Sequence, residues 1–128
     1  MRLACTTCFL LLFPVLASAS PDVTCALENN GERTLVSVPT TRDALEGAWQ
    51  EVGRFRVRTL VAAPAGRRPW LQVEVYARAA RVDKEEDGEE DYRIIASQKV
   101  LAPFATGRME VVEPRLGRSL SYECGAAK

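Results

Sequence analysis

The chain has 128 residues, with 17 basic and 17 acidic side chains and no histidine. This length fits a single domain. The absence of imidazole excludes Ser-His-Asp triads, Cys-His dyads and histidine-bound zinc. The net charge of zero argues against a nucleic-acid binder, because such proteins usually carry a strongly basic face.

The N-terminal residues have the pattern of a secretory signal peptide. Arg2 gives a positive start, an apolar run follows over Phe9–Leu16, and Ala17-Ser18-Ala19 supplies the small residues of a cleavage site. We therefore predict a signal peptide over 1–19 and one exported domain over 20–128. The apolar run is too short to cross a bilayer as a helix, and we expect no transmembrane segment in the mature chain. The expected location is the bacterial periplasm or the exterior of the cell.

Two cysteines remain after the predicted signal, and they lie near opposite ends of the domain. Cys25 and Cys124 each fall on one face of a segment in which apolar and polar residues alternate. In an exported protein such a pair predicts a structural disulfide. The bridge would close a loop of roughly 100 residues and stabilise the fold by about 4–5 kcal/mol in the chain-entropy model.

The first elements in chain order form a predicted hairpin. Its arms are Val23–Leu27 and Thr34–Val38, and the turn between them contains Asn30-Gly31. Both turn residues tolerate a positive φ, which makes this dipeptide a strong hairpin signal.

The next segment, 41–52, has two interpretations. Leu45, Ala48, Trp49 and Val52 have helical spacing. Gly47 in the middle weakens a helix. A short helix and an extended connection therefore both remain open for this segment.

The clearest strands follow and predict a second hairpin. Phe55, Val57 and Thr59 alternate with arginines, and Leu71, Val73 and Val75 alternate with polar residues. We expect Arg54, Arg56 and Arg58 to face Gln72 and Glu74 on the solvent-exposed side of the sheet.

Three further strands are predicted, over Tyr92–Val100, Arg108–Glu113 and Ser119–Cys124, after an exposed acidic loop. The total is about seven strands joined by hairpin connections. The sequence thus predicts a mainly β fold, either an antiparallel β-sandwich or an open barrel, closed by one disulfide.

The acidic loop 83–91 suggests a weak calcium site. Asp83, Glu85, Asp87 and Gly88 match the opening of an EF-hand loop, but position 12 is Ile94 in place of the bidentate glutamate. A solvated hairpin loop accounts for the same residues. Calcium is the one cofactor that the sequence suggests.

Two other groups are candidate contact residues. Arg54, Arg56, Arg58, Arg67 and Arg68 could bind an anion or an acidic partner, because guanidinium groups match carboxylate and phosphate. The same arginines would also suit the solvated face of a sheet. Trp70 follows Pro69 at a strand start, where an exposed ring could contact a sugar or a protein.

The segments Ile94–Pro103 and Gly107–Val112 together resemble a strand pair of bacterial secretins. The proline that precedes the basic residue in that family is Gln98 here, and the ring-forming and membrane-inserting parts have no counterpart in the chain. The resemblance implies a small periplasmic β-module near an envelope machine, and it assigns no functional residue.

Taken together, these features predict a non-enzymatic binding module that acts as an adaptor, inhibitor or accessory subunit for an envelope protein or secretion component. One alternative is a calcium-modulated binding domain that uses loop 83–91. Another is a small histidine-free hydrolase with two carboxylates in a groove.

Overall fold

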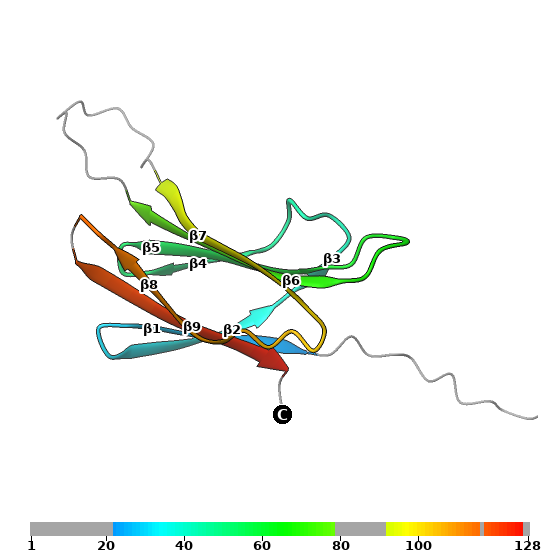
Figure 1. Cartoon of the computed structure of the whole chain (residues 1–128), viewed down its shortest axis with the longest axis horizontal. Helices are drawn as coiled ribbons and strands as arrows, with labels where there is room; N and C mark the ends of the chain where they lie inside the picture. Colours follow the sequence, from blue (N-terminus) through cyan, green and yellow to red (C-terminus); the bar gives the residue numbers. More distant parts are fainter. Residues whose placement is uncertain (1–21, 79–91, 116, 127–128) are drawn as a thin grey trace, which may run out of the picture.

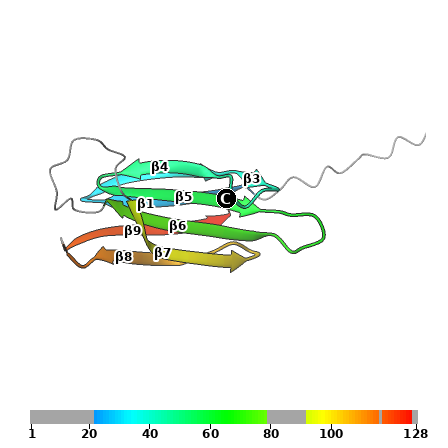
Figure 2. The ribbon, with the colours of Figure 1, turned by 90° about the horizontal axis from the view of Figure 1, so that it is seen from above.

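The computed structural model describes residues 22–78, 92–115 and 117–126. These residues form nine strands in two layers that pack face to face (Figures 1 and 2), which confirms the predicted β-sandwich. The strands are β1 (Val23–Asn29), β2 (Glu32–Val38), β3 (Thr40–Thr41), β4 (Ala48–Val52), β5 (Phe55–Ala62), β6 (Trp70–Arg78), β7 (Tyr92–Leu101), β8 (Gly107–Glu113) and β9 (Arg118–Ala126).

Each layer is one sheet. Sheet A has the order β2-β1-β9-β8 and is antiparallel throughout. Sheet B has the order β3-β5-β6-β7, and β4 also pairs with β5. Only the short β3 runs parallel to its neighbour β5 in the described chain. The two edge strands β7 and β8 lie on the same side of the sandwich (Figure 2).

The first predicted hairpin is confirmed, and its arms are longer than expected. Asn29 pairs with Glu32, so the turn consists of Asn30 and Gly31 alone. Their φ angles are 52° and 79°, as a type I′ turn requires. The Asn-Gly dipeptide therefore sets the register of β1 against β2.

The short helix considered for 41–52 is not formed. Ala48–Val52 instead pairs as β4 with the first part of β5, which would otherwise expose its backbone edge. Before it, the backbone N–H of Leu45 donates to the Asp43 carboxylate at 2.8 Å, and that of Asp43 donates to the Thr41 hydroxyl at 3.2 Å. Such local side-chain bonds compete with a helix.

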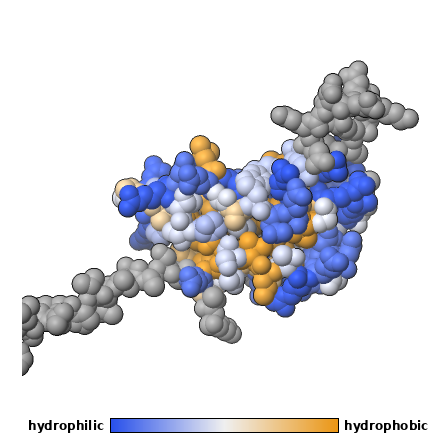
Figure 3. Space-filling view, turned by 180° about the vertical axis from the view of Figure 1, so that it is seen from behind, coloured by the Kyte–Doolittle hydropathy of each residue, from blue (hydrophilic) through white to orange (hydrophobic). Residues whose placement is uncertain are grey.

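The core lies between the sheets. Its buried cluster contains Leu27 and Leu120 from sheet A and Val57, Leu71 and Val75 from sheet B. Burying each Val or Leu side chain contributes about 1.5–3 kcal/mol. Seen from behind, hydrophobic side chains form a band across the middle of the molecule, between hydrophilic groups above and below (Figure 3).

Several predictions fall on residues that the structure does not describe. The signal peptide over 1–19 and the calcium candidates Asp83, Glu85 and Asp87 lie outside the described ranges. The described residues contain no helix that could span a membrane.

Candidate binding surface on sheet B

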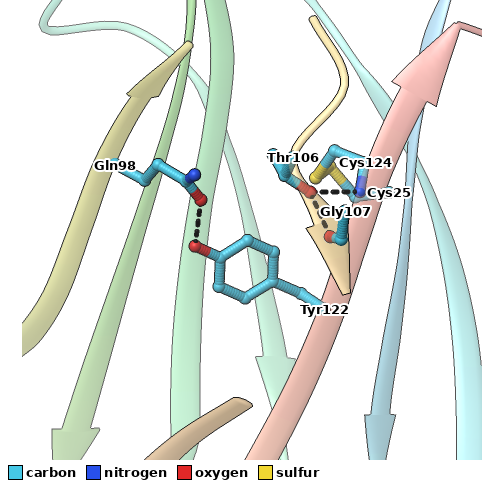
Figure 4. The surroundings of a disulfide bond; sticks show 6 residues. All are labelled: Cys25, Gln98, Thr106, Gly107, Tyr122 and Cys124. Carbon is cyan, nitrogen blue, oxygen red and sulfur yellow. Dashed lines mark hydrogen bonds between the residues drawn. A yellow bond between two sulfur atoms is a disulfide. The ribbon is translucent and has the colours of Figure 1, made fainter. Parts of the chain in front are cut away.

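The predicted disulfide is confirmed, and it joins two neighbouring strands. Cys25 on β1 lies directly opposite Cys124 on β9, and their sulfur atoms are bonded (Figure 4). Thr106 supports this pair, because its hydroxyl accepts a hydrogen bond of 2.9 Å from the Cys124 backbone N–H. Both cysteines are buried, so they act as a structural cross-link within sheet A.

The predicted arginine group is divided by the fold. Arg54 is exposed in the turn before β5, and Arg67 and Arg68 are exposed in the loop after it. The eight residues of β5 separate these two places by about 25 Å. Only Arg56 and Arg58 share one surface, the outer face of β5. The five arginines therefore do not form a single anion site.

The structure contradicts the expectation that Arg58 is exposed to solvent. Its residue surface is 8% exposed, as is that of Glu74, which is its register partner on β6. The Arg58 Nε donates to the Glu74 Oε2 at 2.5 Å. Its Nη1 donates to the backbone carbonyl of Ala44 at 3.0 Å. Arg58 thus fastens the 42–47 connection to the sheet and is occupied by internal partners.

Polar neighbours complete this buried ion pair. Gln72 donates to the Glu74 Oε1 at 2.9 Å, and the Tyr76 hydroxyl donates to the Oε2 at 3.2 Å. The hydrogen bond from Arg58 lowers the pKa of the Glu74 carboxyl, and the same bond raises the pKa of Arg58. Burial raises the pKa of Tyr76. Both groups of the pair therefore stay charged at neutral pH.

Aromatic rings and cations cover this network. The Trp49 and Tyr76 rings lie 5.2 Å apart between centroids, tilted by 50°. The Arg56 guanidinium lies 4.2 Å from the Tyr92 centroid and 5.9 Å from that of Trp49. It also pairs with Glu51 at 2.8 Å. These contacts hold Arg56 in one orientation above the sheet.

Strand register explains why these groups meet. Trp49, Arg58, Glu74 and Ser97 form one row across β4, β5, β6 and β7, and the next row contains Glu51, Arg56, Tyr76 and Ile94. Trp49 is 52% exposed and Ile94 is 50% exposed. We call the surface formed by Trp49, Glu51, Arg56, Tyr76, Tyr92 and Ile94 the aromatic face.

Trp70 lies at the start of β6, six residues before Tyr76, and is not a bare exposed ring. Its indole N–H donates to the Gln72 Oε1 at 3.2 Å, and the Lys99 ammonium lies 5.5 Å from its centroid. The half-buried ring packs at the start of β6. Its expected contact surface is therefore partly used inside the protein.

Most residues of the aromatic face were absent from the sequence-based candidates. Trp49 and Glu51 fell in a segment with two interpretations. The sequence contains no signal for them, because apolar and polar residues do not alternate over Ala48–Val52. The alternating burial of β4, in which Gln50 and Val52 are more covered than Trp49 and Glu51, is seen only in the structure. Tyr92 and Ile94 gave no signal beyond their place in a predicted strand.

Sheet A carries a different kind of surface from the aromatic face. A shallow hollow of about 560 Å³ on sheet A is lined mainly by small residues, among them Ala26, Gly107 and Gly125. Among the described residues Glu74 is the one buried carboxylate, and no group of three potential metal-binding side chains occurs.

Comparison with protein-family models, curated protein sequences and solved structures found no match.

The two segments that resemble a secretin strand pair form β7 and β8. These strands belong to different sheets, and they pair with β6 and β9 respectively. They are therefore not partners in one hairpin, and the resemblance carries no further argument.

Proposed function

We propose that this protein is an exported, non-enzymatic binding module that docks a protein of the cell envelope through the aromatic face. In this role it acts as an adaptor, inhibitor or accessory subunit of an envelope protein or secretion component. The observation that carries the proposal is the array of Trp49, Arg56 and Tyr92 on the outer face of sheet B.

The residue types on this face favour a protein partner. Trp, Tyr and Arg are the side chains most enriched at the energetic centres of protein interfaces. Ile94 adds an exposed aliphatic group at the end of the row that contains Arg56 and Tyr76. A protein surface could cover both the rings and this aliphatic group.

The rigidity of the face also supports docking. The Arg58–Glu74 pair underneath is buried and hydrogen-bonded on both carboxylate oxygens. Arg56 is held by Glu51 and by two rings. A face ordered in advance loses less conformational entropy on binding.

Site-specific photocrosslinking tests the proposal. A photoreactive phenylalanine analogue is placed at position 49 or 94, and at position 112 as the control. Val112 is 54% exposed and lies on β8 of sheet A. The oxidised protein is irradiated in its native envelope, and the adducts are identified by mass spectrometry.

We expect positions 49 and 94 to label the same protein and position 112 to label it far less. Trp49→Ala should then weaken the purified complex by at least about tenfold, because interface tryptophans often contribute 2 kcal/mol or more. Equal labelling from all three positions, or none from 49 and 94, would refute the proposal.

A further inference from the structure

The open edge of β2 is a second feature that points to a partner. In the described chain β2 pairs only with β1, and it forms the edge of sheet A opposite to β8. One side of its backbone therefore has no strand beside it among the residues that the structure describes. An unpaired strand edge is a template for another strand.

The hairpin geometry determines which residues offer their backbone groups to that side. In a two-residue hairpin the pair that closes the turn, here Asn29 and Glu32, is hydrogen-bonded, and the pattern then alternates. Ala26 and Leu35 consequently form a non-hydrogen-bonded pair. The N–H and C=O groups of Arg33, Leu35 and Ser37 therefore point away from β1.

The charges of β2 lie at its first two residues, Glu32 and Arg33, whereas those of the edge strands β7 and β8 are spread along each strand. β7 carries Arg93 and Lys99, and β8 carries Arg108 and Glu110. Charged residues on an edge strand oppose pairing with another chain. In β2 the stretch from Thr34 to Val38 is uncharged. Leu35, at the centre of β2, is 70% exposed.

We propose that two copies of this chain pair antiparallel through β2, with the twofold axis at Leu35. Leu35 then lies opposite its own twin, and Arg33 lies opposite Ser37 of the second copy. All three outward-pointing residues find partners, which gives about six backbone hydrogen bonds across the junction. The two exposed Leu35 side chains cover each other on the outer face of the joined sheet.

Other registers are less favourable. Slipping one strand by one residue would place an outer side chain opposite an inner one. Moving the axis to Thr34 or Val36 keeps the faces matched, but it pairs only two of the three outward-pointing residues and gives about four hydrogen bonds in place of six. An axis at Arg33 would set two like charges directly opposite each other. An axis at Ser37 would place Leu35 opposite Pro39, which has no N–H to donate. Leu35 is therefore the centre that the sequence of β2 favours.

The pairing goes beyond the proposed function, because it does not use the aromatic face. A twofold axis perpendicular to sheet A leaves both aromatic faces pointing in the same direction. One dimer would then present two docking surfaces to a partner, and bivalent binding raises the apparent affinity without new contacts.

Sedimentation of the chain, expressed with its own N-terminal segment and recovered oxidised, tests the pairing. We expect twice the monomer mass at micromolar concentration. Leu35→Lys should raise the dimer dissociation constant by at least about tenfold, because two ammonium groups would meet at the axis. Val112→Lys, at an exposed position on β8, is the matched control and should leave the mass unchanged.

Cysteine crosslinking tests the register. Cα atoms of a hydrogen-bonded antiparallel pair lie about 5.5 Å apart, within the range for a disulfide. Leu35→Cys should therefore form a covalent dimer on mild oxidation. Ser37→Cys should not, because the two copies of residue 37 would be separated by about 13 Å along the strands. The unsubstituted chain serves as the control and shows how much covalent dimer its own cysteines form.

A monomer at all concentrations would overturn the proposal, and so would equal crosslinking of the two variants. A complex formed by β2 with a strand of a different protein, without self-association, would overturn it as well. Leu35→Lys can abolish the dimer while position 49 still crosslinks to its partner. This result would show that pairing through β2 and docking at the aromatic face are independent.

Discussion

The Tyr122 hydroxyl donates a hydrogen bond of 2.6 Å to the side-chain oxygen of Gln98 (Figure 4). Tyr122 belongs to β9 and Gln98 to β7, so this bond connects the two sheets across the interior. It lies beside the disulfide, which joins strands within one sheet. The hydrogen bond therefore joins sheet A to sheet B, whereas the disulfide joins two strands of sheet A.

We predict that Tyr122→Phe lowers the free energy of unfolding by about 1 kcal/mol, because it leaves the Gln98 oxygen without its donor. A double-mutant cycle with Gln98→Ala, measured by urea unfolding, should give a coupling energy of about 1 kcal/mol. Additive effects of the two substitutions would contradict the bond.

Burial also makes Tyr122 sensitive to alkaline pH. Desolvation raises the pKa of its hydroxyl in the folded protein. The stability that the neutral hydroxyl provides is therefore complete below the ordinary tyrosine pKa of about 10 and is lost as pH rises above it. Urea midpoints between pH 8 and 11 should fall more steeply for the parent than for Tyr122→Phe.

The buried ion pair predicts the opposite dependence in acid. Because Arg58 lowers the pKa of Glu74, the contribution of the charged carboxylate is present above the ordinary carboxyl pKa of about 4 and is lost as pH falls. Glu74→Gln should cost about 3–5 kcal/mol at pH 7, because it leaves a buried guanidinium without its counter-ion. Its stability should also change less between pH 6 and 3.

Glu51→Gln is the matched control for that prediction. Glu51 pairs with Arg56 on the surface, with 67% of its side chain exposed. Such a pair contributes about 0–1 kcal/mol. Equal losses for Glu51→Gln and Glu74→Gln would show that burial does not strengthen the inner pair.

Thr59 offers a test with a gain in stability. It is 1% exposed, and its hydroxyl oxygen has no hydrogen-bond partner in the described structure. Thr59→Val keeps the shape and removes an unsatisfied polar group, so the protein should become more stable by about 1 kcal/mol. Thr59→Ser keeps the hydroxyl and loses a methyl group, and should destabilise the protein. The thermal unfolding temperatures of both variants show whether the two substitutions change stability in opposite directions.

Gly53 is constrained by a neighbour as well as by its backbone. Its φ is 60°, and an added Cβ would collide with the Asn29 side chain, whose amide donates to the Val52 carbonyl at 3.3 Å. Gly66 has a φ of 77° but open space around it. Gly66→Ala should cost about 1 kcal/mol, the penalty of a left-handed alanine. Gly53→Ala should cost more, which chemical denaturation of the two variants can measure.

The hairpins were predictable because their signals are local. Asn30-Gly31 selects its turn type, and the alternation around Val57 and Val73 marks the inner faces of β5 and β6. The pairing of Cys25 with Cys124 followed from the same alternation and from a unique connectivity. The turn dipeptide and the alternation are each contained in a few neighbouring residues, and the disulfide needed in addition only that two cysteines remain in the predicted domain.

The parts that were missed depend on tertiary contacts. The segment Ala48–Val52 has spacing that suits a helix, and only the available edge of β5 makes it a strand. Alternation correctly placed Arg58 on the outer face of sheet B. It could not show that the 42–47 connection folds back to accept a hydrogen bond from this arginine. Burial of an outward-facing residue is decided by what covers it.

The position of the disulfide has a mechanical consequence. Val23 lies opposite Ala126 and Thr24 lies opposite Gly125, so the two ends of the fold leave the molecule side by side. The next pair, Cys25 and Cys124, is covalently joined. A tension applied between the two ends can therefore peel apart only the first two residue pairs before the sulfur–sulfur bond carries the load. The remaining strands stay outside the path of the force, and the oxidised domain transmits a pull without being extended by it.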